Sequence, residues 1–364
     1  MLSPFVYEAL PMRVLFGNGT VAKLAFEAER LGMKRVLVLS TPEQAAQAQD
    51  IATTLGPLSA GVFSQATMHT PSHITELALE VVRREAVDGV VSVGGGSTTG
   101  LGKAIALRTD LPQIVIPTTY AGSEMTPILG ETNNGEKVTQ RTLKVLPETT
   151  IYDVSLTLSL PVGLTATSGM NAIAHAVEAL YAEEGNPIIS LMAEDAIAAL
   201  AAALPVIIEK PRDLEARTRA QYGAWLCGVA LGSVGMALHH KLCHVLGGSF
   251  GLPHAETHTV VLPHAVAYNA AAAPEAMRRI ARALGASDAA GGLHDIARKL
   301  NAPTALAALG MKESDLDRAA DLATAKPYPN PRPLERTAIR ALLEDAFRGA
   351  RPKSSNSVIH GAAA

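Results

Sequence analysis

Apolar and polar residues are patterned in two different ways along the chain, and the change falls near residue 160. In the first part, short apolar runs rich in β-branched residues alternate with longer runs of helical spacing, such as 74–86. The short runs predict buried strands at 35–39, 88–93, 113–116 and 149–153. Because helices between strands imply crossover connections, we predict an α/β region with a mostly parallel sheet.

Beyond Leu160-Pro161 the strand signals nearly vanish, and long Ala-rich runs take over. Their apolar spacing predicts helices at 169–182, 188–209, 213–241, 274–284, 293–300 and 332–348. The predicted fold class is therefore an α/β N-terminal domain followed by an all-α C-terminal domain, with the boundary between residues 155 and 162.

Composition excludes several classes of protein. Hydrophobic residues make up 48% of the 364 residues and aromatic residues 4%, so the core must be built mostly from small aliphatic side chains. A net charge of −3 offers no footprint for nucleic acid or anionic membrane, and two cysteines are too few for a disulfide framework. The N-terminus does not resemble a signal peptide, and the uncharged stretch 220–238 is interpreted as a buried helix, so we expect a cytoplasmic protein.

A glycine-rich turn follows the strand predicted at 88–93. The order of strand, glycine turn and helix lets the backbone approach a phosphate at a helix N-terminus, although a tight turn between strand and helix also uses glycine. The loop 117–124 follows the next strand and therefore opens at the same edge of the sheet. The cofactor-binding residues predicted from these loops are Gly94, Gly95, Gly96, Ser97, Thr118, Thr119 and Ser123.

The end of the strand at 35–39 bears on the choice of cofactor. Domains that require NAD usually present an acidic side chain there to the ribose 2′-OH, whereas this chain presents Ser40 and Thr41. We therefore predict that these two residues are cofactor-binding and that both NADH and NADPH are used. Thr41, Pro42 and Gln44 also predict a capping box that opens the next helix.

Histidines are crowded into one part of the chain. Six of the 11 lie within the 26 residues 239–264. Asn171 and His175 are four residues apart in a predicted helix, as are His240 and His244, and His254 follows in a predicted loop. Such a cluster suits either a metal ion or polarisation and protonation of a carbonyl. The pattern leaves the roles of the other three, His239, His258 and His264, undecided.

Together these motifs resemble the iron-containing alcohol dehydrogenase family over nearly the whole chain. The matching segments are 94–97, Pro-Thr-Thr-x-x-Gly-Ser-Glu at 117–124, the helix 169–178, and 240–244 through 253–254. The resemblance implies a Rossmann-like NAD(P)-binding domain, 1–157, and a helical domain carrying the histidines, 158–364, with the active site in the cleft between them. It also implies that Lys144 borders the cofactor and meets the nicotinamide ribose, and that the first 20 residues pair across a homodimer.

Two departures from the family pattern narrow the resemblance. Metal-dependent members have Asp at the position of Asn171, where it ligates iron or zinc together with the histidines matching His175, His240 and His254. Most members also have Asp at the position of Gly100. Both departures, and the segment 326–333, resemble the maleylacetate reductase branch. That branch reduces the C=C bond of maleylacetate to give 3-oxoadipate in the catabolism of aromatic compounds, and it is described as working without a metal.

The residues suggest a mechanism that matches these departures. Hydride addition to a C=C bond conjugated to a ketone develops charge on the ketone oxygen, and hydrogen-bond donors can stabilise that charge in place of a metal. We expect Asn171, His175, His240 and His254 to form this polar pocket and His244 to donate the proton. For the carboxylates of the dicarboxylate substrate, the candidates are Arg332, Lys241 and Tyr328.

Three alternative functions compete with this hypothesis. The nearest is a metal-dependent alcohol or aldehyde reductase whose site tolerates Asn171, which would bind stoichiometric iron or zinc. A lyase resembling dehydroquinate synthase would need a full metal site and many phosphate-binding cations, and the sparse basic residues argue against it. A non-catalytic nucleotide-binding protein is disfavoured by the intact histidine set.

Overall fold

A six-stranded parallel sheet forms the frame of the first of two units, Ala9–Leu160, in this computed structural model, which describes residues 4–133 and 136–352. The middle strands are buried on both faces, which explains their continuous apolar runs. The spatial order is β1-β8-β5-β4-β2-β3, and the bounds are β1 Arg13–Phe16, β2 Val36–Leu39, β3 Ser59–Phe63, β4 Gly89–Gly94, β5 Gln113–Pro117 and β8 Thr149–Tyr152.

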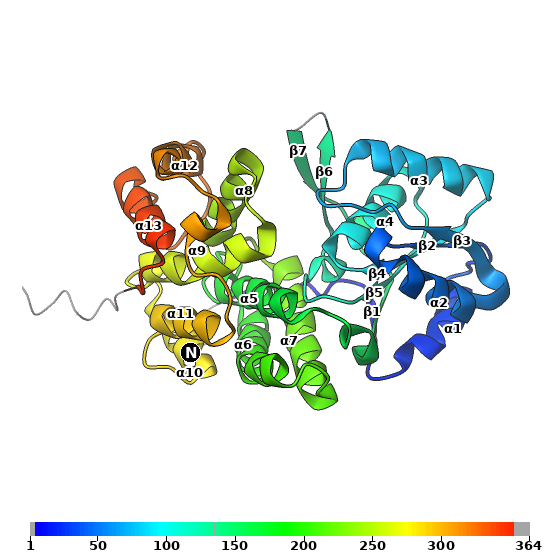
Figure 1. Ribbon diagram of the computed structural model, residues 1–364, viewed down its shortest axis with the longest axis horizontal. Coiled ribbons are helices and arrows are strands. Elements are labelled where there is room, and N and C mark those ends of the chain that lie inside the picture. The colour runs from blue at the N-terminus through cyan, green and yellow to red at the C-terminus, as the bar shows by residue number, and fades with distance from the viewer. Residues whose placement is uncertain (1–3, 134–135, 353–364) are drawn as a thin grey trace, which may run out of the picture. The chain divides into compact units, whose positions relative to one another are not determined.

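Helices cover both faces of this sheet (Figure 1). On one face α1 (Leu24–Arg30) and α2 (Ala45–Leu55) pack on alternate side chains of the strands, and on the other face α3 (Ser72–Arg84) and α4 (Gly96–Thr109) do so. The helices that follow the neighbouring strands β2 and β4 therefore leave to opposite faces. The carboxyl ends of these two strands form the switch point of the sheet, where ligands of open α/β folds bind.

Three strands of this unit were not predicted as observed. The strand β3 has only two large apolar residues, and the hairpin of β6 (Ile128–Asn133) and β7 (Glu136–Arg141) lies outside the main sheet. The short strand β1 pairs in parallel with β8 and forms one edge of the same sheet. Its backbone partners lie more than 130 residues away, which local patterning does not reveal.

The described part of the second unit comprises residues 4–8 and 161–352, and all regular structure in it is helical. Small residues let its helices approach closely: a Cβ on Gly169 would lie 2.6 Å from the Leu204 side chain. The helices are α5 Val162–Ala179, α6 Pro187–Glu209, α7 Leu214–Ser233, α8 Leu238–Phe250, α9 His254–Asn269, α10 Pro274–Leu284, α11 Ala289–Lys299, α12 Leu316–Thr324 and α13 Arg336–Arg348.

One of these helices, α6, is long and apolar enough to cross a membrane by length and composition. It packs against α5, α7 and α10, and its inward face is fully buried at Ala193, Ile197 and Leu200. These contacts are those of a core helix. The uncharged stretch 220–238 likewise lies in buried parts of α7 and the turn after it.

The helix predicted at 213–241 is wrong, because the structure breaks it in two. The first part, α7, ends at Ser233, and α8 begins at Leu238 at an angle of 94° to it. A new helix start exposes backbone N–H groups that need acceptors, and here a buried carboxylate supplies them, that of Glu178. Because that partner lies about 60 residues earlier in the chain, the apolar pattern alone does not reveal the break.

Candidate active site

One face of the buried helix α5 carries the first group of site residues. Asn171, His175 and Glu178 follow one another at spacings of four and three residues, which places them on the same side of the helix. All three are at least 95% buried. The surrounding residues of α5 are mostly Ala, so these polar side chains are embedded in an apolar helix and need specific partners.

Glu178 organises the start of α8. Its two carboxylate oxygens accept the backbone N–H groups of Ala237 and His239, each at 2.9 Å, and that of His240 at 3.3 Å. The same carboxylate lies 2.7 Å from Nδ1 of His240. A negative charge at a helix N-terminus is favourable, and here it also fixes a neighbouring ring.

The contact with Glu178 sets the tautomer of His240. Because a carboxylate oxygen accepts, Nδ1 of His240 supplies the proton of this contact, while Nε2 of the same ring is buried without a hydrogen-bond partner. The His175 ring stacks on this ring at 5.1 Å between centroids. Nδ1 of His175 and Oδ1 of Asn171 are also buried without a partner. Three of the predicted residues, Asn171, His175 and His240, therefore each have a buried polar atom without a hydrogen-bond partner.

The other two predicted histidines lie at the exposed side of this group. The His244 ring lies 6.4 Å from the His240 ring, one turn along α8, and His244 is exposed. His254 is not a loop residue as predicted but the first residue of α9, with Pro253 before it, and it is also exposed. Its ring lies 4.4 Å from that of His258.

Two histidines whose roles the sequence left undecided belong to the same group. His239 and His258 are fully buried, and Nε2 of the first lies 3.0 Å from Nδ1 of the second. Burial lowers the pKa of each of these rings, and that of His175, well below the usual value, with neighbouring imidazoles adding to the effect. The spacing of His258, one helical turn after His254, is the sequence signal that points to it.

The residues present do not fit the iron ion that the family resemblance implies. Ligand atoms of His239, His240 and His258 do lie within 4.8 Å of one another. Two of these rings, however, are already hydrogen-bonded to each other, and the carboxylate of the cluster, Glu178, is engaged by α8 and by His240. Among the residues that the structure describes here, the unpartnered atoms are neutral nitrogens and an amide oxygen, which do not offset a divalent charge.

The predicted substrate-binding residues fall into two places. Tyr328 has a buried, unpartnered hydroxyl whose pKa is raised by burial and by the Glu178 carboxylate, and Lys241 lies 5.8 Å from the centre of its ring. Arg332 instead stacks on the Tyr268 ring at 4.2 Å and forms an ion pair with Glu335 at 3.6 Å. Tyr328 therefore lies near the histidine cluster, whereas the Arg332 charge is partly used elsewhere.

A short amide network holds the segment that carries Tyr328 and Arg332. The side chains of Asn330 and Asn269 exchange two hydrogen bonds, of 2.8 and 3.0 Å. Asn330 also accepts the backbone N–H of Leu238 at the start of α8 and donates to the carbonyl of Arg332. The Pro-rich segment is thereby fixed to the helix that bears His240.

The predicted glycine turn forms the start of α4 in the first unit. Gly94 has a φ of +149°, and a Cβ there would lie 2.6 Å from the Thr98 hydroxyl, so a larger residue is excluded. Gly96 is exposed, Ser97 is half-buried, and no side chain caps the first turn of α4. Free amides at a helix N-terminus bind phosphate, so the turn fits the pyrophosphate of a dinucleotide.

The other predicted cofactor residues flank this turn at the same edge of the sheet. Thr118 follows β5 and its backbone N–H binds the carbonyl of Gly94 at 3.0 Å, while Thr119 approaches Gly95. Ser40, after β2, is buried with an unpartnered hydroxyl. The predicted capping box is absent: the Gln44 side chain donates to Thr118 at 2.8 Å and bridges the two loops instead.

A buried lysine secures the loop that contains Ser123. Lys103 of α4 donates to the carbonyls of Ser123, Thr126 and Ile128 and to the Thr126 hydroxyl, at 2.6 to 2.9 Å. Burial lowers its pKa to about 7, and the nearby Glu124 carboxylate opposes that change. Local sequence patterns do not reveal this residue, because its acceptors are backbone atoms of another segment.

The prediction for Lys144 is wrong. Its ammonium lies 3.8 Å from Asp110, which ends α4, and that helix runs from the glycine turn to the opposite edge of the sheet. Lys144 is therefore at the edge where β5 begins, whereas phosphate-binding loops lie where the strands end.

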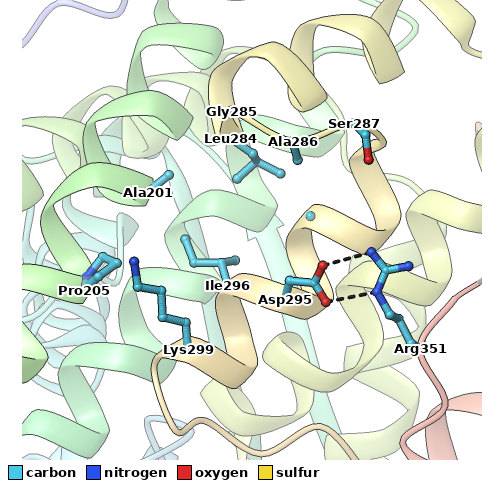
Figure 2. A pocket seen from close by; sticks show the side chains of 11 residues that line it. Ala201, Pro205, Leu284, Gly285, Ala286, Ser287, Asp295, Ile296, Lys299 and Arg351 are labelled. Carbon is cyan, nitrogen blue, oxygen red and sulfur yellow. Dashed lines mark hydrogen bonds and ion pairs between the residues drawn. The ribbon is translucent and has the colours of Figure 1, made fainter.

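A pocket of about 420 Å³ in the helical unit lies apart from these residues (Figure 2). No histidine of the cluster lines it. Its Arg351 is paired with Asp295 through two contacts of 3.0 and 2.8 Å, so that cation is neutralised. The pocket is thus not the site that the histidine motifs predict.

Comparisons with known proteins agree with the two units. The profile of iron-containing alcohol dehydrogenases matches residues 11–154, and that of the C-terminal part of the Fe-containing alcohol dehydrogenase family matches 165–347. The chain belongs to the iron-containing alcohol dehydrogenase family. Its members are oxidoreductases, and several relatives of high sequence identity carry a more specific name.

A maleylacetate reductase of Rhizobium sp. (strain MTP-10005) is 59% identical over 352 residues, 97% of this chain and 100% of the relative. Another, of Burkholderia cepacia, is 58% identical over 351 residues, 96% of this chain and 100% of the relative. A crystal structure of maleylacetate reductase from Agrobacterium tumefaciens covers 96% of this chain and 100% of its own, with a TM-score of 0.94 and 59% identity. Several relatives that match nearly the whole chain are thus named maleylacetate reductase.

Proposed function

We propose that this oxidoreductase is a maleylacetate reductase that uses NADH or NADPH and works without a metal ion. The observation that carries the proposal is the site around His240, in which an uncharged amide stands at residue 171 and the Glu178 carboxylate is already bound by α8 and His240. The identity to named maleylacetate reductases supports the same substrate.

The reaction matches a pocket of neutral hydrogen-bonding groups. The substrate is a dicarboxylate in which a C=C bond is conjugated to a ketone. A nicotinamide cofactor, held by the glycine turn at 94–97, would supply a hydride to the carbon β to that ketone. The C=C electrons move to the ketone oxygen as an enolate, and a proton then adds to the adjacent carbon. The product keeps the ketone and has a C–C single bond in place of the C=C bond. Donors that are already positioned stabilise the enolate without reorganisation.

We assign the enolate-stabilising pocket to Asn171, His175, His240 and His254, and the proton to His244. The exposure of His244 suits that role, because a proton donor must regain its proton from water after each turnover. A direct measurement is single-turnover hydride transfer by His244→Ala. A loss of about 100-fold supports the assignment, and an unchanged rate removes His244 from the mechanism.

For the cofactor, the glycine turn at 94–97, Ser40, Thr41, Thr118, Thr119 and Ser123 are the proposed contacts. The Thr41 hydroxyl donates to Glu43 and lowers the pKa of that exposed carboxyl. We still propose that both NADH and NADPH are used. A preference for NADH above roughly a thousandfold in kcat/KM contradicts this.

The remaining proposals concern the substrate carboxylates, the assembly and the location. We assign one carboxylate to Lys241 and Tyr328, beside the cluster, and keep Arg332 as a candidate for the other. A homodimer in the cytoplasm is the proposed state. No nucleic acid or membrane partner is proposed.

A second candidate function is a metal-dependent alcohol or aldehyde reductase. The observation that favours it is the approach of ligand atoms of His239, His240 and His258 to within 4.8 Å of one another. Imidazole is a good ligand for zinc and copper as well as for iron. This candidate predicts bound metal and activity on simple aldehydes.

The two candidates are separated by one substrate comparison. Oxidation of NADH and of NADPH is followed with maleylacetate and with small aldehydes, and the product is identified by NMR. We expect 3-oxoadipate from maleylacetate and little turnover of the aldehydes. No reaction with maleylacetate rejects the proposed function and leaves the family assignment intact.

A further inference from the structure

A second pair of histidines lies behind the groups assigned above. His239, on the first turn of α8, and His258, on α9, are both fully buried, and their facing nitrogens are 3.0 Å apart. The His258 ring lies 4.9 Å from the His240 ring and 4.4 Å from the His254 ring. The pair therefore belongs to the cluster, although nothing assigned so far uses it.

One ring nitrogen of His258 has no hydrogen-bond partner within the described part of the chain. Its Nδ1 faces His239, while Nε2 is buried and has no hydrogen-bond partner. A buried imidazole nitrogen without a hydrogen-bond partner lowers the stability of the folded protein. A ligand that bonds to this nitrogen would recover that stability.

The pocket as assigned lacks a neutral donor on its α8 side. The His240 ring donates to Glu178 through Nδ1, so its Nε2 is an acceptor as long as the ring is neutral. A ketone oxygen, and the enolate that forms from it, accepts hydrogen bonds and needs donors. His258 is suitably placed to supply one if the proton of its own ring sits on Nε2.

Which nitrogen of His258 carries the proton depends on its contact with His239. One proton is shared between the two facing nitrogens, and both rings are too buried to be charged readily. If Nε2–H of His239 donates to Nδ1 of His258, the proton of His258 must be on its Nε2. If His258 donates instead, its Nε2 carries a lone pair. Cys243 lies 3.8 Å from Nε2 of His239, so its sulfur can accept part of the same N–H.

We propose that His258 binds the substrate through an Nε2–H that donates to the ketone oxygen, and that His239 is a positioning residue that holds His258 in this tautomer. The proposal rests on the proposed function, since it takes the substrate to be an unsaturated oxo-dicarboxylate. In this arrangement His239 fixes the position of the proton on the His258 ring, as the Glu178 carboxylate does for the His240 ring.

The first test reads the tautomers directly and does not depend on turnover. In protein labelled with ¹⁵N-histidine, two-bond and three-bond ¹H–¹⁵N couplings distinguish a ring protonated at Nε2 from one protonated at Nδ1. We expect His258 protonated at Nε2 and His240 protonated at Nδ1. A lone pair on Nε2 of His258 overturns the proposal, whether or not maleylacetate is a substrate.

The second test measures kcat and KM for maleylacetate in matched variants. His258→Leu should lower kcat by about 100-fold with a smaller change in KM, because a donor to developing charge acts mainly in the transition state. His258→Gln, which keeps an N–H near the same place, should recover part of the rate. His239→Leu should lower kcat by less, and His239→Gln, which restores a donor to His258, should recover it.

The control lies on the same helix. His264 is also buried and has an unpartnered Nε2, but it is outside the cluster, so His264→Leu should leave kcat within about twofold of the wild type. A rate within about twofold in His258→Leu overturns the proposal. If the wild-type protein does not reduce maleylacetate, the proposed function fails, and the tautomer measurement alone decides the assignment of His258.

Discussion

At the scale of single residues, Asn171 places an uncharged amide in the site, and the carboxylate of Glu178 is held by the start of α8 and by His240. The sequence predicted the first of these, because Asn171 stands where a carboxylate is expected by resemblance. It did not reveal the second, since the partners of Glu178 lie 59 to 62 residues away and are backbone groups of a helix start. His258 was left undecided for the same reason: its partner His239 is 19 residues away, on another helix.

Glu178→Gln tests the role of that carboxylate. A glutamine can still accept one backbone N–H but no longer offers a charge to Nδ1 of His240, so kcat should fall by about 10- to 100-fold. The melting temperature should fall as well, because buried N–H groups at the α8 start lose an acceptor. Rates and thermal unfolding are measured on the same preparations.

The matched control is Glu184→Gln. That carboxylate accepts the N–H of Gly235 in the same turn but is exposed. We expect little change in kcat. An equal loss of kcat in both variants would mean that Glu178 acts only by holding the turn.

At the scale of elements, strands buried on both faces were easier to predict than exposed strands or the ends of helices. The apolar runs of β2, β4, β5 and β8 were predicted because strands buried on both faces need them. The break between α7 and α8 was missed, because it is stabilised by a distant carboxylate rather than by Pro or a local cap. The capping box at Thr41 failed because Gln44 finds a partner in the neighbouring loop.

Lys103→Met tests whether α4 holds the cofactor loop. The substitution keeps most of the side-chain volume but leaves four buried acceptors without their donor, so we expect a loss of roughly 3 kcal/mol in the free energy of unfolding. The affinity for NADH should fall because the loop bearing Thr118, Thr119 and Ser123 loosens. Denaturant unfolding and NADH fluorescence titration measure the two effects.

Lys23→Met serves as the control, since Lys23 is an exposed residue of the same unit. It should change neither quantity. A Lys103→Met protein with wild-type stability and NADH affinity would show that the loop is held by other contacts.

At the scale of the whole molecule, the core of the helical unit is filled mostly by small side chains and buried histidines rather than by aromatic or charged side chains. The composition predicted this packing, because 4% aromatic residues cannot fill a core of this size. It could not predict which histidines are buried, since burial depends on how the helices pack. Six of them are buried in the described part of this unit, and four of these have a pKa that burial lowers: His175, His239, His258 and His264.

The stability of the protein should therefore fall in mild acid. Burial lowers the pKa of His264 to about 4, so the unfolded chain takes up a proton near pH 6.5 and the folded protein does so only near pH 4. This residue alone should cost about 3 kcal/mol of unfolding free energy between those pH values, and nothing above them. The other three lowered pKa values act in the same direction.

Denaturant unfolding between pH 8 and pH 4.5 measures this effect. His264→Gln should flatten the pH dependence, whatever its effect at pH 8, and His73→Gln, at an exposed histidine, should not. A His264→Gln protein with the same pH dependence as the wild type would contradict the assignment of this proton uptake to His264.

The central claim is that the protein reduces maleylacetate with NADH or NADPH at the histidine cluster, without a metal ion. It is tested most directly by the rate of NADH oxidation with maleylacetate, measured on protein of known iron and zinc content before and after exhaustive EDTA treatment. We predict the full rate from protein with far less than one metal ion per chain. A rate that disappears with the metal and returns when iron or zinc is added back would contradict the claim.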